Sequence, residues 1–335
     1  MRVWWVGYIL VGLAVVAAAI YAAFVFSPWP SVLLIRHAFH RDAVARNLAL
    51  EKHAPADIGV MGDQLYGEGQ DETLDVYLPA GVADKALPAV VWVHGGGFVA
   101  GNKDDLSGYL KILAGHGYVA VAVGYSLAPG ARYPTPVLQA NKALAFLARN
   151  AGRYHIDPNR LFLAGDSAGA QIVAQLAATV GNPAYAAMVG VSPAVAPAQL
   201  KGVALFCGVY DASRVSPEGP FASFIRTVMW SYIGTKRLDD DPRLAEFSVN
   251  RHLTPQFPPA FVSVGNADPL APQSTLIAGA IGAQGVSTDT LFFPEDYSPA
   301  LPHEYQFDLD TKAGAEALER LLAFLHRLAG EATTQ

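Results

Sequence analysis

The stretch LFLAGDSAGAQIVAQ, residues 161–175, indicates the fold more clearly than any other part of the chain. Residues 160–164 form a short apolar run typical of a buried strand, and residues 170–179 contain good helix formers. Between them lies Gly165-Asp166-Ser167-Ala168-Gly169, a G-x-S-x-G pattern. In a strand-turn-helix unit, the glycines around this sharp turn leave room for the serine hydroxyl to point outward at the head of the helix. A tight turn with an inert serine is the alternative, because the chain has 31 glycines.

A second glycine-rich segment, HGGGF, follows another predicted strand, AVVWV at residues 89–93. Three consecutive glycines cost backbone entropy, so they indicate a place where the backbone must approach another group closely. A loop of this type supplies N–H groups to an oxyanion hole, together with the residue after the serine. We therefore expect the oxyanion donors to be Gly96, Gly97 and Ala168. His94 precedes the loop, and we interpret it as a residue that holds the loop in shape.

These two motifs resemble those of the hormone-sensitive-lipase-like family of α/β-hydrolase esterases. The resemblance runs from about Asp71 to the C-terminal helix and includes GYSLAP at residues 124–129 and the segment FPPA at residues 257–260 that leads to Asp268-Pro269-Leu270. It implies an α/β-hydrolase fold with a helical cap. The family usually has an acid at position 124, an arginine at 126, an acid at 130 and a glycine at 170, where this chain has Gly, Ser, Gly and Ala. These departures argue against the family's supporting charged network near the turn and leave the nucleophile unchanged.

A serine hydroxyl is a poor nucleophile at neutral pH, so it needs a base, and the base needs an orienting acid. In this fold the chain order is Ser, then Asp or Glu, then His. Three histidines follow Ser167, namely His252, His303 and His326. His326 lies within a predicted helix and His252 precedes any acid at a strand end. We therefore predict that His303 is the base.

The predicted acid is Asp268, which follows the strand predicted at residues 259–265 by a short turn and matches the D-P-L motif of the family. An aspartate at such a place also commonly caps a helix. Glu295 and Asp296 are rivals because they lie in the loop that leads to His303. The acidic run at residues 239–241 is expected to be solvated.

The composition limits the class of protein. With 335 residues, 52% of them hydrophobic, the chain is long enough for one α/β domain with appendages. The net charge of −6 argues against a nucleic-acid-binding surface. Cys207 is the single cysteine, which excludes an internal disulfide and a cysteine-based metal site. We expect neither a metal nor an organic cofactor, and nothing in the sequence specifies an oligomeric state.

The N-terminus contains a candidate membrane span. Residues 3–26 carry no charge and are long enough to cross the hydrocarbon core of a bilayer. A cleavable signal peptide, after which the protein would be secreted, is the alternative, but its apolar core is usually shorter. We therefore expect a single-pass membrane protein. The basic residues after the span place the domain on the inner side, whereas arylacetamide-deacetylase-like relatives place it on the far side, so the orientation stays open.

The remaining pattern predicts a mostly parallel central sheet with helices on both faces. We assign residues 1–30 to the anchor, 31–57 to a juxtamembrane or cap helix, and 58–335 to the hydrolase domain, with a cap insert at about 211–252. The insert contains an aromatic helical run from Phe221 to Tyr232, which is either an ordinary helix at the sheet edge or a wall of the substrate pocket. The strands are predicted at 59–66, 73–78, 118–124, 203–209 and 288–293, in addition to those above, and the helices at 106–114, from 134, 276–283 and 311–328.

The resemblance implies a serine carboxylesterase that works through an acyl-enzyme. If Phe221, Phe224 and Trp230 of the cap bound the pocket, short to medium acyl chains are preferred. Ser167 would be the nucleophile, His303 the base and Asp268 the orienting acid. An amide or formamide hydrolase on the same three residues is the alternative. A ligand-binding receptor on a hydrolase scaffold is more remote, because such receptors in this family have lost the catalytic histidine, whereas His303 is present.

Overall fold

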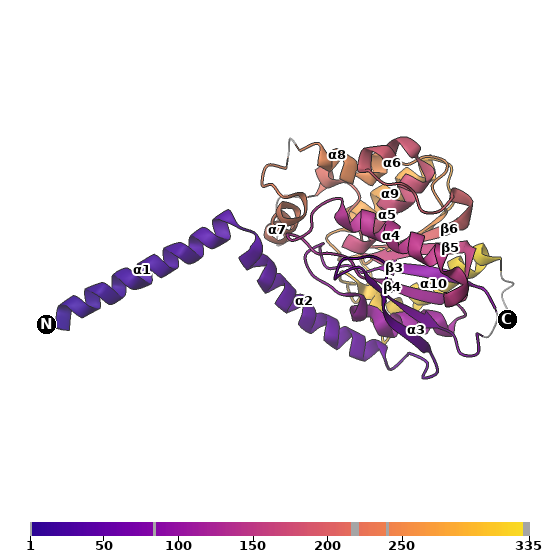
Figure 1. Ribbon diagram of the computed structural model, residues 1–335, viewed down its shortest axis with the longest axis horizontal. Coiled ribbons are helices and arrows are strands. Elements are labelled where there is room, and N and C mark those ends of the chain that lie inside the picture. The colour runs from indigo at the N-terminus through magenta and orange to yellow at the C-terminus, as the bar shows by residue number, and fades with distance from the viewer. Residues whose placement is uncertain (1, 83–84, 216–220, 239–240, 331–335) are drawn as a thin grey trace.

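The computed structural model describes residues 2–82, 85–215, 221–238 and 241–330, with side chains from residue 5 onward. Its centre is an eight-stranded sheet in the order β1-β2-β4-β3-β5-β6-β7-β8 (Figure 1). β2 pairs antiparallel with β1 and with β4, and the other neighbours pair parallel, which confirms the mostly parallel sheet. The strands are β1 Gly59–Leu65, β2 Thr73–Leu78, β3 Leu87–Val93, β4 Val119–Val123, β5 Ile156–Asp166, β6 Leu200–Phe206, β7 Ala260–Val264 and β8 Thr288–Phe292.

The central strands are apolar on both sides because helices cover both faces of the sheet. On β3, Val91 and Val93 belong to one buried cluster, whereas Val90 and Trp92 belong to the other, as the two-residue alternation of a strand requires. The first cluster includes residues of α4 (Thr135–Arg149), α5 (Ala168–Gly181) and α9 (Ala271–Ala283). The second includes residues of α3 (Ser107–Gly115) and α10 (Lys312–Ala329). Predicted helix and strand positions agree with these elements to within a few residues, except that α9 begins at Ala271 rather than at residue 276.

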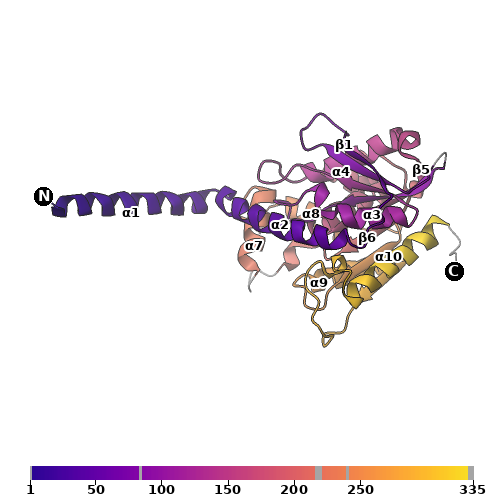
Figure 2. The same cartoon turned by 90° about the horizontal axis from the view of Figure 1, so that it is seen from below.

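Two helices precede the sheet. α1 (Arg2–Phe26) projects away from the body (Figures 1 and 2). Its segment Trp5–Phe26 is long and apolar enough to cross a membrane, and the most apolar part of this segment is not buried against the rest of the protein. α2 (Trp29–Leu50) packs on the body. Its Arg36 donates through Nε to the carbonyl of Val99 at 2.7 Å, and its Asn47 accepts the N–H of Gly108 at 2.9 Å. The juxtamembrane helix is therefore fastened to the hydrolase body at several points.

The insert after β6 forms α7 (Ala222–Ile233) and α8 (Arg243–Phe247). The ring of Tyr232 stacks on Phe98 of the HGGGF segment with centroids 4.0 Å apart. Both views show α7 beside the junction of α1 and α2 (Figures 1 and 2). In the acidic run, Asp241 forms an ion pair with Arg243, while residues 239 and 240 lie outside the described residues.

One predicted element is corrected, and one helix was not predicted. The strand predicted at residues 203–209 ends at Phe206, because Cys207 has a φ of 45° and takes the chain out of the sheet. A short helix, α6 (Pro183–Val189), was not predicted. Asn182 caps this helix by accepting the N–H of Tyr185 at 3.1 Å. The sequence shows this capping residue, but the apolar segment of seven residues after it is too short to show a helical period.

The second glycine of the G-x-S-x-G motif is required by close packing. A Cβ atom on Gly169 would lie 1.9 Å from the carbonyl oxygen of Val93, because the first turn of α5 passes over the end of β3.

We expect Gly169→Ala to lower the free energy of unfolding by about 1–3 kcal/mol, since the backbone of β3 would have to move. The matched control is Gly282→Ala in α9, where a Cβ meets nothing within 4 Å and alanine is the better helix former. Thermal melting of the two variants tests this, and equal Tm values would contradict it.

Candidate active site

Ser167 occupies a strained turn between β5 and α5. Its φ of 50° and ψ of −116° are rare for a residue with a side chain, and such strain persists only where the surroundings enforce it. Here the N–H of Ser167 donates to the carbonyl of Phe206 at 2.8 Å, and its own carbonyl accepts the N–H of Gln171 at 3.2 Å. A Cβ on Gly165 would lie 2.6 Å from the carbonyl carbon of Gly169, so the turn closes only with glycine there. The local structure is the predicted elbow, with the serine at the N-terminus of a helix.

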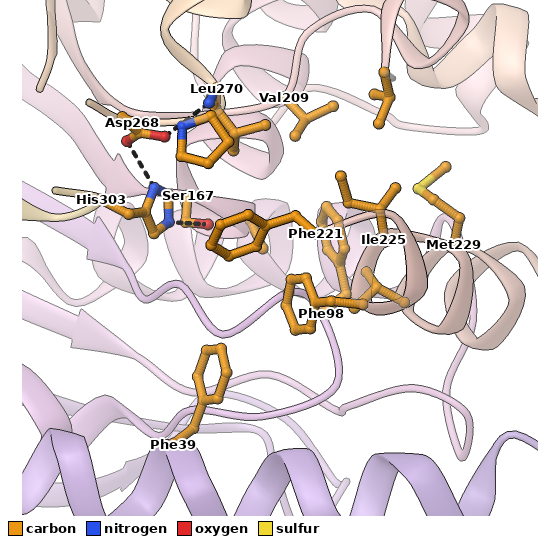
Figure 3. A pocket seen from close by; sticks show the side chains of 16 residues that line it. Phe39, Phe98, Ser167, Val209, Phe221, Ile225, Met229, Asp268, Leu270 and His303 are labelled. Atoms are coloured by element: carbon orange, nitrogen blue, oxygen red, sulfur yellow. Dashed lines mark hydrogen bonds and ion pairs between the residues drawn. The ribbon is translucent and has the colours of Figure 1, made fainter. Parts of the chain in front are cut away.

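The structure brings Ser167, His303 and Asp268 together (Figure 3). His303 Nδ1 lies 2.7 Å from Asp268 Oδ2, and His303 Nε2 lies 3.0 Å from Ser167 Oγ. A carboxylate accepts only, so Nδ1 carries the hydrogen and Nε2 is free to accept the hydrogen of the serine hydroxyl. Both distances are those of good hydrogen bonds. The three residues follow β5, β7 and β8, and the carboxyl ends of these parallel strands meet at one edge of the sheet.

The alternative acids and bases lie elsewhere. Glu295 and Asp296 are exposed, whereas Asp268 is 4% exposed. His252 stacks on Tyr185 with centroids 4.0 Å apart, and His326 stacks on Tyr118. Asp268 also accepts the N–H of Leu270 at 2.8 Å, so it holds the turn before α9 as well as the imidazole.

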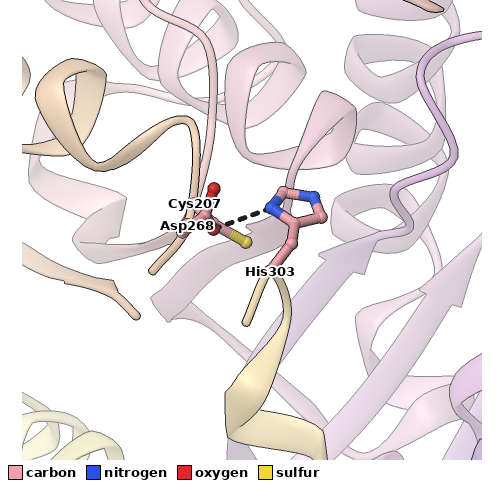
Figure 4. Close-up of side chains that lie close together, drawn as sticks. All are labelled: Cys207, Asp268 and His303. Carbon is pink, nitrogen blue, oxygen red and sulfur yellow. Dashed lines mark hydrogen bonds and ion pairs between the residues drawn. The ribbon is translucent and has the colours of Figure 1, made fainter. Parts of the chain in front are cut away.

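Burial lowers the pKa of His303, whereas the hydrogen bond to the Asp268 carboxylate and the negative charge of that carboxylate raise it. Burial also raises the pKa of the Cys207 thiol, so the thiol is neutral and the Asp268 carboxylate is the group that favours the imidazolium. Cys207, Asp268 and His303 present ligand atoms within 4.8 Å of one another (Figure 4). They do not suit a metal ion, because Nδ1 uses its hydrogen on Asp268 and the thiol is protonated.

The glycine-rich loop approaches Ser167 from the end of β3. Gly96 and Gly97 have φ values of 108° and 60°, which other residues rarely adopt, and the Gly96 carbonyl accepts from the N–H of Ala100 at 2.9 Å. Within the described residues, the N–H groups of Gly96 and Gly97 have no hydrogen-bond partner. Gly97 and Ala168 both line the cavity that contains Ser167. Two of the predicted oxyanion donors, Gly97 and Ala168, therefore lie beside the serine, and Gly96 is the neighbour of Gly97 in the loop.

His94 contacts this loop and not Ser167. Its Nδ1–H donates to the Gly95 carbonyl at 2.7 Å, and its ring stacks on Tyr125 with centroids 4.3 Å apart. Burial lowers the pKa of His94 to about 4, so the ring is neutral. These contacts agree with the interpretation of His94 as a residue that shapes the loop.

Ser167 and His303 line a cavity of about 330 Å³ (Figure 3). Phe39 of α2 contributes to its wall, and Phe224 of α7 stacks on Phe39 with centroids 5.9 Å apart. Trp230 and Tyr232, which belong to the same aromatic run, do not line the cavity: Trp230 lies beneath Lys236, and Tyr232 packs on Phe98. Besides Phe39 and Phe224, the aliphatic and aromatic side chains that line the cavity are Phe98, Val209, Val215, Phe221, Ile225, Val228, Met229, Pro269 and Leu270.

Comparisons with known sequences agree with this fold and site. The model of a family described as alpha/beta hydrolase fold matches residues 90–299. Carboxylesterase NlhH of Mycobacterium tuberculosis is 32% identical over 264 residues, which is 77% of this chain and 78% of that protein. The chain therefore belongs to the α/β hydrolases of the hormone-sensitive-lipase-like family.

Other relatives match over shorter stretches. Esterase LipC of Mycobacterium tuberculosis is 29% identical over 62% of this chain, which spans only 51% of the length of that protein. Kynurenine formamidase of Danio rerio is 36% identical over 46% of this chain and 47% of its own length. Among solved structures, esterase B from Lactobacillus rhamnosis superposes with a TM-score of 0.76 at 23% identity, covering 90% of this chain and 96% of that one, a likeness that shows the shared fold.

The two hydrogen bonds of His303 lead to a prediction about the acid. Asp268→Asn removes the carboxylate that orients the imidazole, so we expect turnover of an activated ester to fall by a factor on the order of 10⁴, as in other Ser-His-Asp enzymes. The pKa of His303 is raised by its neighbours, and activity is lost as the pH falls through that pKa. Without the carboxylate, any residual activity should persist to lower pH. Glu295→Gln and Asp296→Asn are the controls and should behave like the wild type; greater damage from Glu295→Gln would overturn the assignment of the acid.

Proposed function

We propose that this protein is a serine carboxylesterase. The observation that carries the proposal is the chain of hydrogen bonds from Asp268 through His303 to Ser167 at the floor of an apolar cavity. The relatives that match over most of the chain support it, since they are named carboxylesterase and acetyl esterase. The reaction is acyl transfer from an alcohol to the serine and then to water.

The geometry supports a two-stage mechanism. Ser167 Oγ attacks the ester carbonyl while its proton passes to His303 Nε2, and the oxyanion that forms is stabilised by the N–H groups of Gly96, Gly97 and Ala168. The imidazolium then protonates the leaving alcohol as the C–O bond breaks, leaving an acyl-serine. In the second stage water gives its proton to His303 and attacks the acyl carbonyl; the bond between the acyl carbon and Ser167 Oγ then breaks, and the imidazolium returns the proton to Oγ. The free serine and the carboxylic acid are the products of that stage.

The size of the cavity bears on the substrate. A volume of about 330 Å³ is at the small end of the range for ligand sites. The wall formed by α2 and α7 is apolar and includes Phe39, Phe224 and Met229. This favours short to medium acyl chains over long ones. An amide or formamide hydrolase remains the second candidate, because the same three residues serve both reactions and kynurenine formamidase is among the relatives.

A panel of substrates tests the function. We expect the wild type to hydrolyse four- to eight-carbon acyl esters faster than a sixteen-carbon ester measured below micelle formation, and faster than the matching anilides or formamides. Ser167→Ala should lower turnover of the preferred ester by a factor on the order of a million, as the loss of a nucleophilic serine does elsewhere. If the variant kept more than about a hundredth of the wild-type rate, another nucleophile would be responsible. Preference for the formamide would establish the second candidate.

We further propose that residues 1–30 anchor the protein in a membrane, that residues 31–57 and about 211–252 form the cap, and that residues 58–335 include the hydrolase domain. The anchor is supported by the apolar, exposed helix Trp5–Phe26. The cap is supported by Phe39 of α2 and Phe224 of α7, which stack on each other over the cavity. A cleaved signal peptide is the alternative for residues 1–30.

Two truncations distinguish an anchor from a cap. Deletion of residues 1–28 removes α1 but leaves α2, so we expect a soluble protein with most of its turnover. Deletion of residues 1–53 also removes Phe39, exposes apolar surface of the cavity and should cause aggregation and a change in acyl preference. The measurement is kcat/KM for several acyl lengths with each truncated chain. Identical profiles would show that α2 is only a spacer, and insolubility of the shorter truncation would argue against a separable anchor.

A further inference from the structure

Next to the candidate active site lies a group of charged side chains that the mechanism above does not use. Arg46 of α2 forms an ion pair with Glu304, the residue after His303. The carboxyl group of Glu304 in turn lies beside that of Asp166, the residue before Ser167, since both approach the same point of the Gly95 backbone. The Asp166 residue is 2% exposed, and the Glu304 and Arg46 side chains are 15% and 27% exposed. The cap helix thus contacts the neighbours of both the serine and the histidine through one chain of polar groups.

Burial and the charge of Arg46 determine the protonation states of Asp166 and Glu304. Two adjacent buried carboxyl groups favour holding one proton between them. Burial, followed by the proximity of Glu304, raises the pKa of Asp166 to about 8, so Asp166 is the protonated partner. Burial alone would raise the pKa of Glu304 as well, but Arg46 lowers it below its usual value. Glu304 therefore carries a negative charge that depends on a residue of α2.

The same two carboxyl groups contact the reacting parts of the site. Asp166 accepts the N–H of Gly95 at 2.8 Å and the indole N–H of Trp92 at 2.8 Å, which fixes the residue before Gly96. A Cβ on Gly95 would lie 2.3 Å from Asp166 Oδ2 and 3.0 Å from Glu304 Oε1, so both carboxyl groups pack closely against the Gly95 backbone. Glu304 itself has a φ of 60°, and its Oε1 lies 4.0 Å from His303 Nε2.

We propose that Glu304 is a positioning residue, kept ionised by Arg46 of α2, whose carboxylate stabilises the imidazolium that His303 becomes during the reaction. This inference rests on the proposed esterase function. At 4.0 Å the carboxylate is too far for a hydrogen bond, so His303 Nε2 stays paired with Ser167, yet near enough to favour a positive charge on the ring. Asp268 supports the ring at Nδ1, and Glu304 supports it from the side of Nε2.

When Glu304 is neutral, burial, the largest cause of the raised pKa of Asp166, still favours the protonated form of that residue. The other titratable groups around this cluster do not replace Glu304 either. Asp105 lies toward Arg46, and burial raises its pKa. His94 and the Cys207 thiol are neutral, as described above. Asp268 keeps its own hydrogen bond to Nδ1. Arg46 has no hydrogen-bond partner for Nε within the described residues, so its ion pair with Glu304 is its main interaction with the body, apart from its position over the ring of Phe307.

The test is the pH dependence of kcat and kcat/KM for a water-soluble activated ester, measured with the full-length chain in detergent. Glu304→Gln keeps the shape but removes the charge, so the pKa of His303 should fall. We expect the acid limb of the profile to move down by roughly one pH unit and kcat to fall about tenfold, because one unit of pKa corresponds to a factor of ten in the stability of the imidazolium. KM should change little, since Glu304 does not line the cavity.

Arg46→Met should move the acid limb in the same direction, because burial protonates Glu304 once the arginine is gone. Combining it with Glu304→Gln should add no further shift, and Arg46→Lys should restore most of the wild-type profile. The matched control is Arg41→Met on the exposed side of the same helix, which should leave the profile unchanged. If Arg46→Met does not fold, Glu304→Gln alone still tests the idea.

Profiles of Glu304→Gln and Arg46→Met that superpose on the wild type, with only a lower Tm, would overturn the inference and leave the group a purely structural ion pair. Glu304→Gln with the wild-type profile and a shifted Arg46→Met would overturn it too. Neither result would affect the proposed function, which stands or falls with ester hydrolysis by the wild type and its loss in Ser167→Ala.

Discussion

The strained backbone of Ser167 depends on the packing of one helix turn against one strand end. α5 passes over β3 so closely that only glycine fits at position 169, and the turn closes so tightly that only glycine fits at position 165. Once the turn is fixed, the serine lies at the edge of the sheet where β3, β6, β7 and β8 also end. Each of those ends delivers one component: the HGGGF loop, the Cys207 turn, Asp268 and the loop to His303. The other site residues therefore take their places relative to a turn that packing alone defines.

The parts of this arrangement that local sequence determines could be predicted. Short apolar runs gave the strands, and the order Ser, Asp, His with the strand ends identified the three residues that the structure brings together. The limits of the elements were less accurate where a single backbone angle decides, as at Cys207. Trp230 belongs to the predicted aromatic run but does not line the cavity. The periodicity of α7 does not say which face of the helix turns toward the cavity.

The charged group formed by Arg46, Asp166 and Glu304 could not be predicted, because its members are far apart in the sequence and each looks ordinary alone. Arg46 reads as a basic residue after a membrane span, and Glu304 as a polar neighbour of the histidine. The departures of this chain from the family pattern at positions 124, 126, 130 and 170 argued against a supporting charged network near the elbow, whereas the structure contains one. In the structure, Gln139 forms hydrogen bonds with the backbone N–H and the hydroxyl of Ser126. The carboxyl group of Asp166 instead accepts the N–H of Gly95.

The junction between α1 and α2 consists of Ser27 and Pro28 alone. Two residues span at most about 7 Å, so the start of α2 stays close to the end of α1. With α1 in a bilayer, the cavity beneath α2 and α7 stays within a fixed short reach of the lipid surface. An ester that dissolves in lipid would then be met at its concentration in the membrane, which for an apolar compound far exceeds its concentration in water. Lipid solubility would thus raise the rate at which a compound is hydrolysed without any closer fit to the cavity.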